Sequence, residues 1–95
     1  MTNKIFEIKD IITIVLASVE EIESKALYGI EEEAYLPAPI KGKLEKVKDS
    51  EKFWSIIDEI TEEIYEGKTG ELNNLNVMHN EINYLASEKL KEYLI

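Results

Sequence analysis

Four glutamates in one predicted helix are the residues whose type and spacing best suit metal chemistry. They follow one another at intervals of three and four positions, which would place their carboxylates on one helix surface: Glu59, Glu62, Glu63 and Glu66. A bound Mg²⁺ or Mn²⁺ would relieve the repulsion between them, because hard cations take oxygen ligands. The spacing therefore indicates either a weak metal site or an acidic helix face in contact with solvent.

Part of this acidic run resembles a known motif. Residues 62–66, Glu-Glu-Ile-Tyr-Glu, are similar to the EExxE half of the motif in MazG-like, all-α nucleotide pyrophosphatases. The resemblance implies metal-dependent nucleotide hydrolysis through these glutamates. Those enzymes also need an ExxD element downstream, and this chain has no Asp after Asp58. We assign no family on five residues and keep the hydrolase as an alternative function.

The single histidine and the absence of cysteine restrict catalysis further. One histidine, His79, cannot form a His-rich metal site, and no Ser or Cys stands beside it in the sequence. We interpret it as a residue at the edge of the core, bonded to a neighbouring polar group. The lack of cysteine excludes disulfides, thiolate metal sites and cysteine nucleophiles. No catalytic residue and no cofactor is predicted, and enzymatic activity is not the favoured interpretation.

Two other sets of residues are typical of contact with another protein. Trp54 and Tyr65 fall at the border between the apolar and acidic faces of their helix, where aromatic side chains can anchor an interface. Uncharged polar side chains, which are cheaper to desolvate than ions, form a stripe along the last predicted helix: Asn73, Asn76, Asn80 and Asn83. The stripe predicts a self-association or partner surface, or an ordinary solvent-exposed face.

Hydrophobic periodicity supplies the helices that would position these residues. Between residues 4 and 28 the aliphatic side chains recur every three or four positions within an arc of about 140°: Ile5, Ile8, Ile11, Ile12, Val15, Leu16, Val19, Ile22 and Ala26. Of the large apolar residues in this segment, only Phe6 and Ile14 fall on the polar side of the helix. Glu23 lies at the margin, and no other polar residue enters the arc. We therefore expect this helix to be central and the core to be dry and aliphatic.

Capping and breaking residues set the expected boundaries. Thr2 or Asn3 can cap the first helix, Gly29 can end it, and Pro37 with Pro39 prevents a regular helix in the connection that follows. No Gly or Pro separates the second and third helices, so they are either distinct or one continuous rod. The expected fold is an all-α antiparallel bundle of about four helices in a single domain over residues 1–95: 4–28, 40–49, 51–66 and 71–94.

Charge and hydropathy narrow the range of partners. The chain has 11 Lys, no Arg and 20 acidic residues, for a net charge of −9. This balance argues against nucleic-acid binding and permits basic protein partners or cations. The net-positive stretch is 41–52, at +5 − 3 = +2. The apolar run in 11–19 is too short to span a membrane and has Glu7 and Asp10 where a signal peptide needs cations, so we expect a cytoplasmic protein.

Three function classes are consistent with these observations. The favoured one is a small helical protein-interaction or regulatory module that acts through exposed helix faces, on a partner protein or as a homodimer. The first alternative is an acidic inhibitor or nucleic-acid mimic that occupies a basic groove. The second alternative is a Mg- or Mn-dependent nucleotide hydrolase that uses the helix-three glutamates. The favoured class requires no residue type that the sequence lacks.

Overall fold

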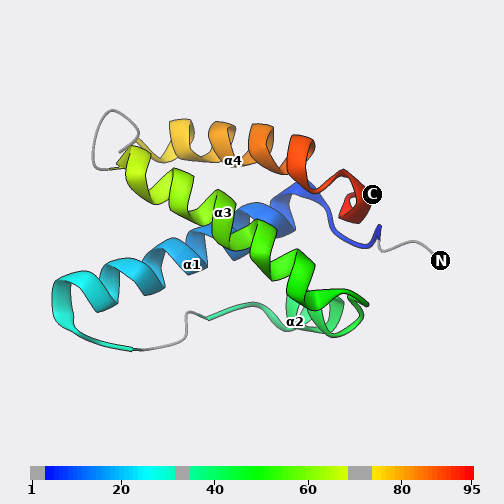
Figure 1. Cartoon of the computed structure of the whole chain (residues 1–95), viewed down its shortest axis with the longest axis horizontal. Helices are drawn as coiled ribbons and strands as arrows, with labels where there is room; N and C mark the ends of the chain where they lie inside the picture. The colour runs from blue at the N-terminus through cyan, green and yellow to red at the C-terminus, as the bar shows by residue number, and fades with distance from the viewer. Residues whose placement is uncertain (1–3, 32–34, 69–73) are drawn as a thin grey trace.

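Four α-helices make up most of the chain. The computed structural model describes residues 4–31, 35–68 and 74–95. Within these residues it contains α1 (Ile8–Tyr28), α2 (Ala38–Glu45), α3 (Ser50–Lys68), α4 (Leu75–Lys89) and a short 3₁₀ turn, η1 (Lys91–Tyr93) (Figure 1). The predicted all-α bundle of four helices is confirmed. The chain leaves the helical path between Lys46 and Asp49, so the second and third helices are separate.

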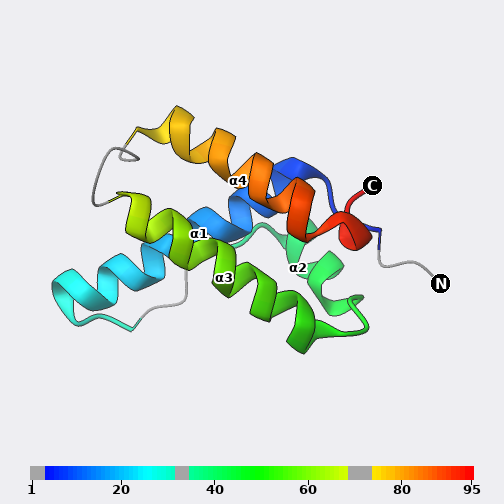
Figure 2. The ribbon, with the colours of Figure 1, turned by 45° about the horizontal axis from the view of Figure 1, so that its top comes forward.

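Each of the three long helices contacts the other two. Contacts join α1 to α3, α1 to α4 and α3 to α4, and Figure 2 shows α3 and α4 lying together in front of α1. α4 runs antiparallel to both of its neighbours, whereas α1 and α3 run in the same general direction (Figure 1). The cause is the connection after α1, which returns the chain along the molecule before α2 begins. Pro37 is the N-cap of α2 and Pro39 lies in its first turn, so the helix begins two residues before the predicted position 40.

The start of α1 differs from the prediction. The helix begins at Ile8 rather than at residue 4, so the prediction of a cap at Thr2 or Asn3, which lie outside the described residues, is wrong. Glu7 is the N-cap, and the Asp10 carboxylate accepts the Glu7 N–H at 3.0 Å. This reciprocal capping box satisfies donors that would otherwise be free in the first turn. At the other end, Gly29 adopts φ 66° and caps the helix as expected.

The core is built from the apolar faces that the periodicity identified. Fully or almost fully buried aliphatic side chains come from α1, α3 and α4 and form one cluster: Ile11, Val15, Val19, Ile57, Ile60, Ile64, Met78, Ile82 and Leu85. Burial of each such side chain stabilises the fold by about 1.5–3 kcal/mol before entropy is counted. At the helix ends the periodicity was misleading, because Ala26 and Leu75 are exposed.

Two residues assigned to the polar side of the first helix are buried. Ile14 is 1% exposed and belongs to the buried core cluster, against which Leu36 from the chain before α2 packs. Phe6 is fully buried. It precedes the helix in extended backbone, so the helical phase used in the prediction does not apply to it. The buried surface of α1 is therefore wider than one arc.

The two ends of the described chain meet over an aromatic cluster. Phe6 stacks on Phe53 with 5.0 Å between ring centroids, and Tyr93 meets Phe53 edge-on at 5.1 Å. The Phe6 N–H donates to the Tyr93 carbonyl at 3.0 Å, and the Ile95 N–H donates to the Phe6 carbonyl at 2.9 Å. These contacts require the chain to turn after Lys89. The prediction that the last helix continues to residue 94 is therefore wrong.

Polar groups enter the core at several points, so the prediction of a dry aliphatic interior is also wrong. Asp10 and Thr61 are buried. The Thr61 hydroxyl donates to the Ile57 carbonyl at 2.7 Å, and the Tyr93 hydroxyl donates to Asp49 at 2.9 Å. Burial, followed by this hydrogen bond, raises the pKa of Tyr93 above its ordinary value. In the described part of the chain, no helix has the length and apolarity needed to cross a bilayer.

Candidate functional site

A groove lies between α1 and α3. It consists of two adjoining hollows of about 540 and 310 Å³. Both hollows are lined by Ser18, Glu21 and Trp54. We call the combined feature the Trp54 groove. The other lining residues are Ile14, Ala17, Tyr35, Leu36 and Lys41 in the larger hollow, and Ile22, Asp58, Thr61 and Glu62 in the smaller one.

Helical spacing explains how two walls come to face each other. The α1 wall repeats every three or four residues from Ile14 through Ser18 to Ile22, and the α3 wall does so from Trp54 through Asp58 to Glu62. The opposite faces of both helices are packed in the core. Both walls are therefore fixed by the bundle, and Tyr35 and Leu36, which precede α2, also line the larger hollow.

Trp54 is held in place by its sequence neighbour. Phe53 is fully buried, whereas Trp54 is 36% exposed. The two rings meet edge-on at 5.7 Å with an interplanar angle of 83°, an arrangement that aromatic pairs favour. Anchoring one ring in the core restricts the other to the mouth of the groove. The predicted interaction residue Trp54 thus belongs to a concave surface.

Small side chains on α1 create the space opposite Trp54. Ala17 and Ser18 are small. The helices α1 and α3 contact each other elsewhere, but at these two positions a hollow remains between their side chains. The Ser18 hydroxyl donates to the Ile14 carbonyl at 3.0 Å, and Thr61 on the other wall also donates within its own helix. Apolar groups could cover these two hydroxyls without leaving their donors unsatisfied.

The charged residues of the groove differ between its two hollows. Glu21 of α1 lines both hollows, Asp58 and Glu62 of α3 line the smaller one, and Lys41 lines the larger one. Glu21, Asp58 and Glu62 are all exposed. The charged lining of the smaller hollow is therefore entirely acidic, whereas that of the larger hollow is one glutamate and one lysine.

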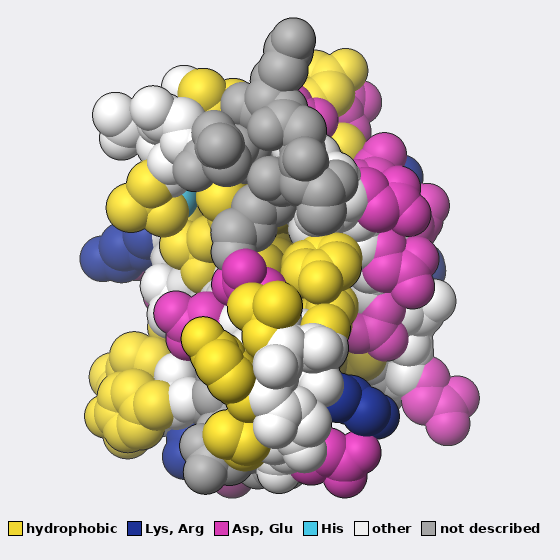
Figure 3. Space-filling view, turned by 90° about the vertical axis from the view of Figure 1, so that its left-hand side faces the viewer, with side chains coloured by type: hydrophobic (Ala, Val, Ile, Leu, Met, Phe, Trp, Pro, Cys, Tyr) yellow, Lys and Arg dark blue, Asp and Glu magenta, His cyan; other side chains and the backbone are white. Residues whose placement is uncertain are grey.

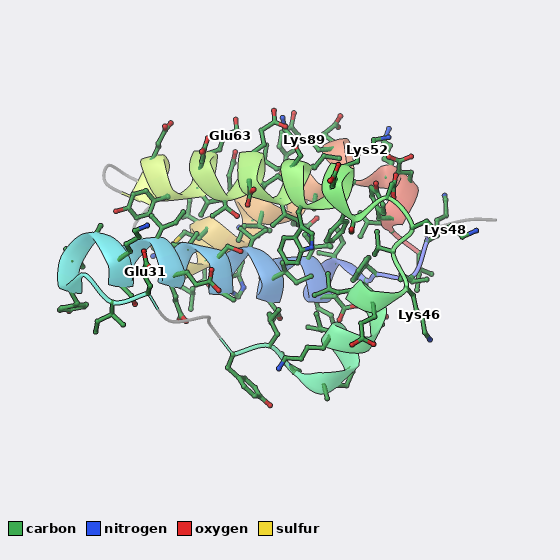
Figure 4. The ribbon with its side chains drawn as sticks, turned by 60° about the horizontal axis from the view of Figure 1, so that its bottom comes forward. Glu31, Lys46, Lys48, Lys52, Glu63 and Lys89 are labelled. Carbon is green, nitrogen blue, oxygen red and sulfur yellow. The ribbon has the colours of Figure 1, made fainter. Side chains whose placement is uncertain are left out.

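The structure distributes the predicted metal ligands over different surroundings. Glu62 lines the groove, whereas Glu59 bonds the Lys89 ammonium of α4 at 3.0 Å. This bond, together with the charges of Glu59 and Glu63, raises the pKa of Lys89. Figure 4 shows Glu63 and Lys89 along the edge of α3 that lies away from α1. The remaining candidate, Glu66, is exposed one turn further along the helix.

In the part of the chain that the structure describes, the four glutamates do not converge on one point, but they contribute to an acidic surface. Among the described residues, no three acidic or histidine side chains are grouped so that they could hold one metal ion. The metal site thus stays a prediction from spacing alone. Acidic side chains nevertheless gather along one side of the molecule, next to exposed apolar groups (Figure 3).

The other predicted interaction residues lie away from the groove lining. Tyr65 is half-buried and packs against the core. Asn76, Asn80 and Asn83 are exposed on α4, and the fourth member of the stripe, Asn73, lies outside the described residues. Ser87 donates a hydrogen bond to Asn83 at 3.4 Å. Self-association through this stripe remains a prediction.

The α1 wall of the groove and the contribution of Leu36 were not predicted from the sequence. Neither Ala17 nor Leu36 was among the predicted interaction residues, and neither was linked to Trp54. The usable signal was the pair of adjacent small residues, Ala17 and Ser18, in a helix otherwise rich in large aliphatic side chains. Comparison of the chain with models of known protein families, with curated proteins and with solved structures found no match.

Proposed function

We propose that this chain is a helical protein-interaction module of the cytoplasm, which binds a partner protein through the Trp54 groove. The observation that carries the proposal is the position of Trp54. A large aromatic side chain stays 36% exposed where two hollows meet, while the adjacent Phe53 is fully buried. Aromatic side chains in concave pockets supply a large share of the free energy of protein binding.

The surroundings of Trp54 also favour binding. The walls belong to α1 and α3, whose other faces are packed in the core, so little ordering is needed when a partner docks. The apolar centre has polar residues around it, among them Glu21, Lys41 and Asp58. An apolar centre with a charged rim is the usual composition of a protein interface.

Affinity capture from the native host lysate tests this proposal when it is done with matched variants of the full chain. Trp54→Ala removes the aromatic side chain from the groove. Tyr84→Ala removes a more exposed aromatic side chain from α4, where Tyr84 is 61% exposed and outside the groove lining. We expect partners captured by the natural chain to be retained by Tyr84→Ala and lost with Trp54→Ala. Circular dichroism of both variants establishes that the helices are intact.

The opposite pattern would overturn the proposal. If Trp54→Ala captures the same proteins as the natural chain, the groove is not the binding surface. If the natural chain captures nothing above a Trp54→Ala background, no partner uses the groove.

A further inference from the structure

The shape of the Trp54 groove limits what can occupy it. Each wall spans nine residues, and therefore eight helical rises, from Ile14 to Ile22 on α1 and from Trp54 to Glu62 on α3. At a rise of 1.5 Å per residue this length is about 12 Å. The seam is helical on both sides, so a third helix of two to three turns could lie along it by ordinary helix packing.

The chemistry of the groove limits the occupant further. Its apolar surface comes from Ala17, Leu36 and Trp54, and the hydroxyls between the walls already donate within their own helices. An apolar stripe on the occupant would therefore leave neither hydroxyl donor unsatisfied. A polar ligand or an extended strand would need backbone or side-chain partners, and helical walls offer no sheet edge for strand addition.

The charged residues of the groove determine which side chains suit the positions beside the apolar stripe of the occupant. Glu21, Asp58 and Glu62 surround the smaller hollow, and a cationic flank would be attracted to them. Acidic flanks would be repelled at the same place, which gives discrimination between partners as well as attraction. Lys41 stands in the other hollow, so the cations of the occupant belong at its end nearest Asp58 and Glu62.

From these three features we infer that the Trp54 groove binds a short amphipathic helix of a partner protein, with an apolar stripe against Trp54 and Lys or Arg beside Asp58 and Glu62. The inference rests on the proposed function and specifies the class of partner. The occupant is a basic helical segment of another protein rather than a second copy of this chain.

A display library of amphipathic helical peptides tests the inference on the full chain. All members share one aliphatic stripe, and their flanking positions are randomised among Lys, Arg, Glu, Gln and Ser. Binding of single peptides is followed by the fluorescence of Trp54, the one tryptophan in the chain. We expect selected peptides to be rich in Lys and Arg at one end, and their affinity to fall as NaCl is raised past about 0.15 M.

Two charge-reversal variants sharpen the test. Asp58→Lys with Glu62→Lys reverses the groove charges, whereas Glu63→Lys with Glu66→Lys makes the same change of net charge outside the groove lining. We expect the first pair to weaken the basic peptides at least ~10-fold and the second pair to weaken them by less than ~2-fold. Thermal unfolding of both variants establishes that they are folded.

Each other outcome would overturn the inference in a recognisable way. Enrichment of neutral or acidic peptides that still need Trp54 would reject the basic partner and leave the proposed function standing. Enrichment of no peptide that depends on Trp54 would reject both. A dimer seen by light scattering, and abolished by Asp58→Lys with Glu62→Lys, would assign the groove to a second copy of the chain.

Discussion

Asp10 in the first turn of α1 and Lys43 in α2 form an ion pair with 2.7 Å between the ammonium nitrogen and Oδ2. The Asp10 side chain is 9% exposed and that of Lys43 is 30% exposed. The same carboxylate accepts the N–H of Glu7 at 3.0 Å. One side chain therefore begins the first long helix and attaches the short helix to it. Burial raises the pKa of Asp10, but the bonds from Lys43 and Glu7 outweigh it, and the net pKa is lowered.

Asp10→Asn should destabilise the protein and weaken its pH dependence in acid. Asparagine can still accept the Glu7 N–H, but it cannot pair with the Lys43 charge. We expect the free energy of unfolding to fall by about 1–2 kcal/mol at pH 7. This is less than for a fully buried ion pair, because solvent partly screens the charge of Lys43. Urea unfolding at several pH values measures it.

The direction of the pH effect follows from the lowered pKa. The contribution of Asp10 is fully present above the unfolded-state value of about 3.9, and it is lost as pH falls through the lower folded-state value. The stabilities of the natural chain and Asp10→Asn should therefore begin to converge as pH falls below about 4, and should meet only below the folded-state pKa of Asp10. Glu20→Gln, on the exposed face of the same helix, serves as control. A constant difference between the natural chain and Asp10→Asn down to pH 2 would contradict the pairing.

Phe53→Ala and Trp54→Ala should separate stability from binding at adjacent positions. Phe53 is the centre of the aromatic cluster and is fully buried, so its truncation should cost about 3–5 kcal/mol. Trp54 lies at the mouth of the groove, and its truncation should cost less than about half of that. Chemical denaturation gives both values. Equal losses would mean that Trp54 is a core residue in solution.

Two glycines should respond to alanine in opposite directions. Gly29 has φ 66° at the end of α1, a conformation that a side chain disfavours, so Gly29→Ala should cost about 1 kcal/mol. Gly42 lies within α2 and has open space where a Cβ would be. Gly42→Ala should stabilise the protein by about 0.5–1 kcal/mol. The melting temperature should fall for Gly29→Ala and rise for Gly42→Ala, relative to the natural chain. A change of the same sign in both variants would contradict the assignment of Gly29 as the cap.

Tyr93→Phe should remove the hydrogen bond to Asp49 and part of the alkaline sensitivity of the fold. We expect a loss of about 1–2 kcal/mol at pH 8, because the acceptor is a carboxylate. The pKa of Tyr93 is raised in the folded state. Its contribution is therefore present below the unfolded-state value of about 10 and is lost as pH rises towards the folded-state value. Urea midpoints at pH 8 and pH 11 should differ less for Tyr93→Phe than for the natural chain.

The sequence predicted the helices because their apolar residues recur at helical spacing over long segments. α3 is the clearest example, since Ile57, Ile60 and Ile64 are all fully buried on the predicted face. The pattern failed where a contact from a distant segment decides the environment. Ile14 belongs to a core cluster to which α3, α4 and Leu36 also contribute, and Phe6 stacks on Phe53 and bonds the C-terminal residues. No local periodicity contains that information.

The same holds for the candidate site: features of a single helix could be predicted, and features that depend on the packing of two helices could not. Trp54 was identified as an interaction residue because its position relative to the apolar face is a property of one helix. The groove around it depends on which residues of α1 face α3, and therefore on how the two helices pack. Ala17 and Ser18 mark the place by their small size, but their partner across the seam is set by the tertiary fold.

The pairing of Phe6 with the C-terminal residues also has a consequence for folding kinetics. The two hydrogen bonds between residue 6 and residues 93–95 close nearly the whole chain into one loop. Closing so long a loop is entropically costly until the intervening helices have packed together. We therefore expect substitutions at Phe6 to accelerate unfolding and to leave the folding rate almost unchanged, which corresponds to φ-values near zero. Such values would place the joining of residue 6 to residues 93–95 late in folding and their separation early in unfolding.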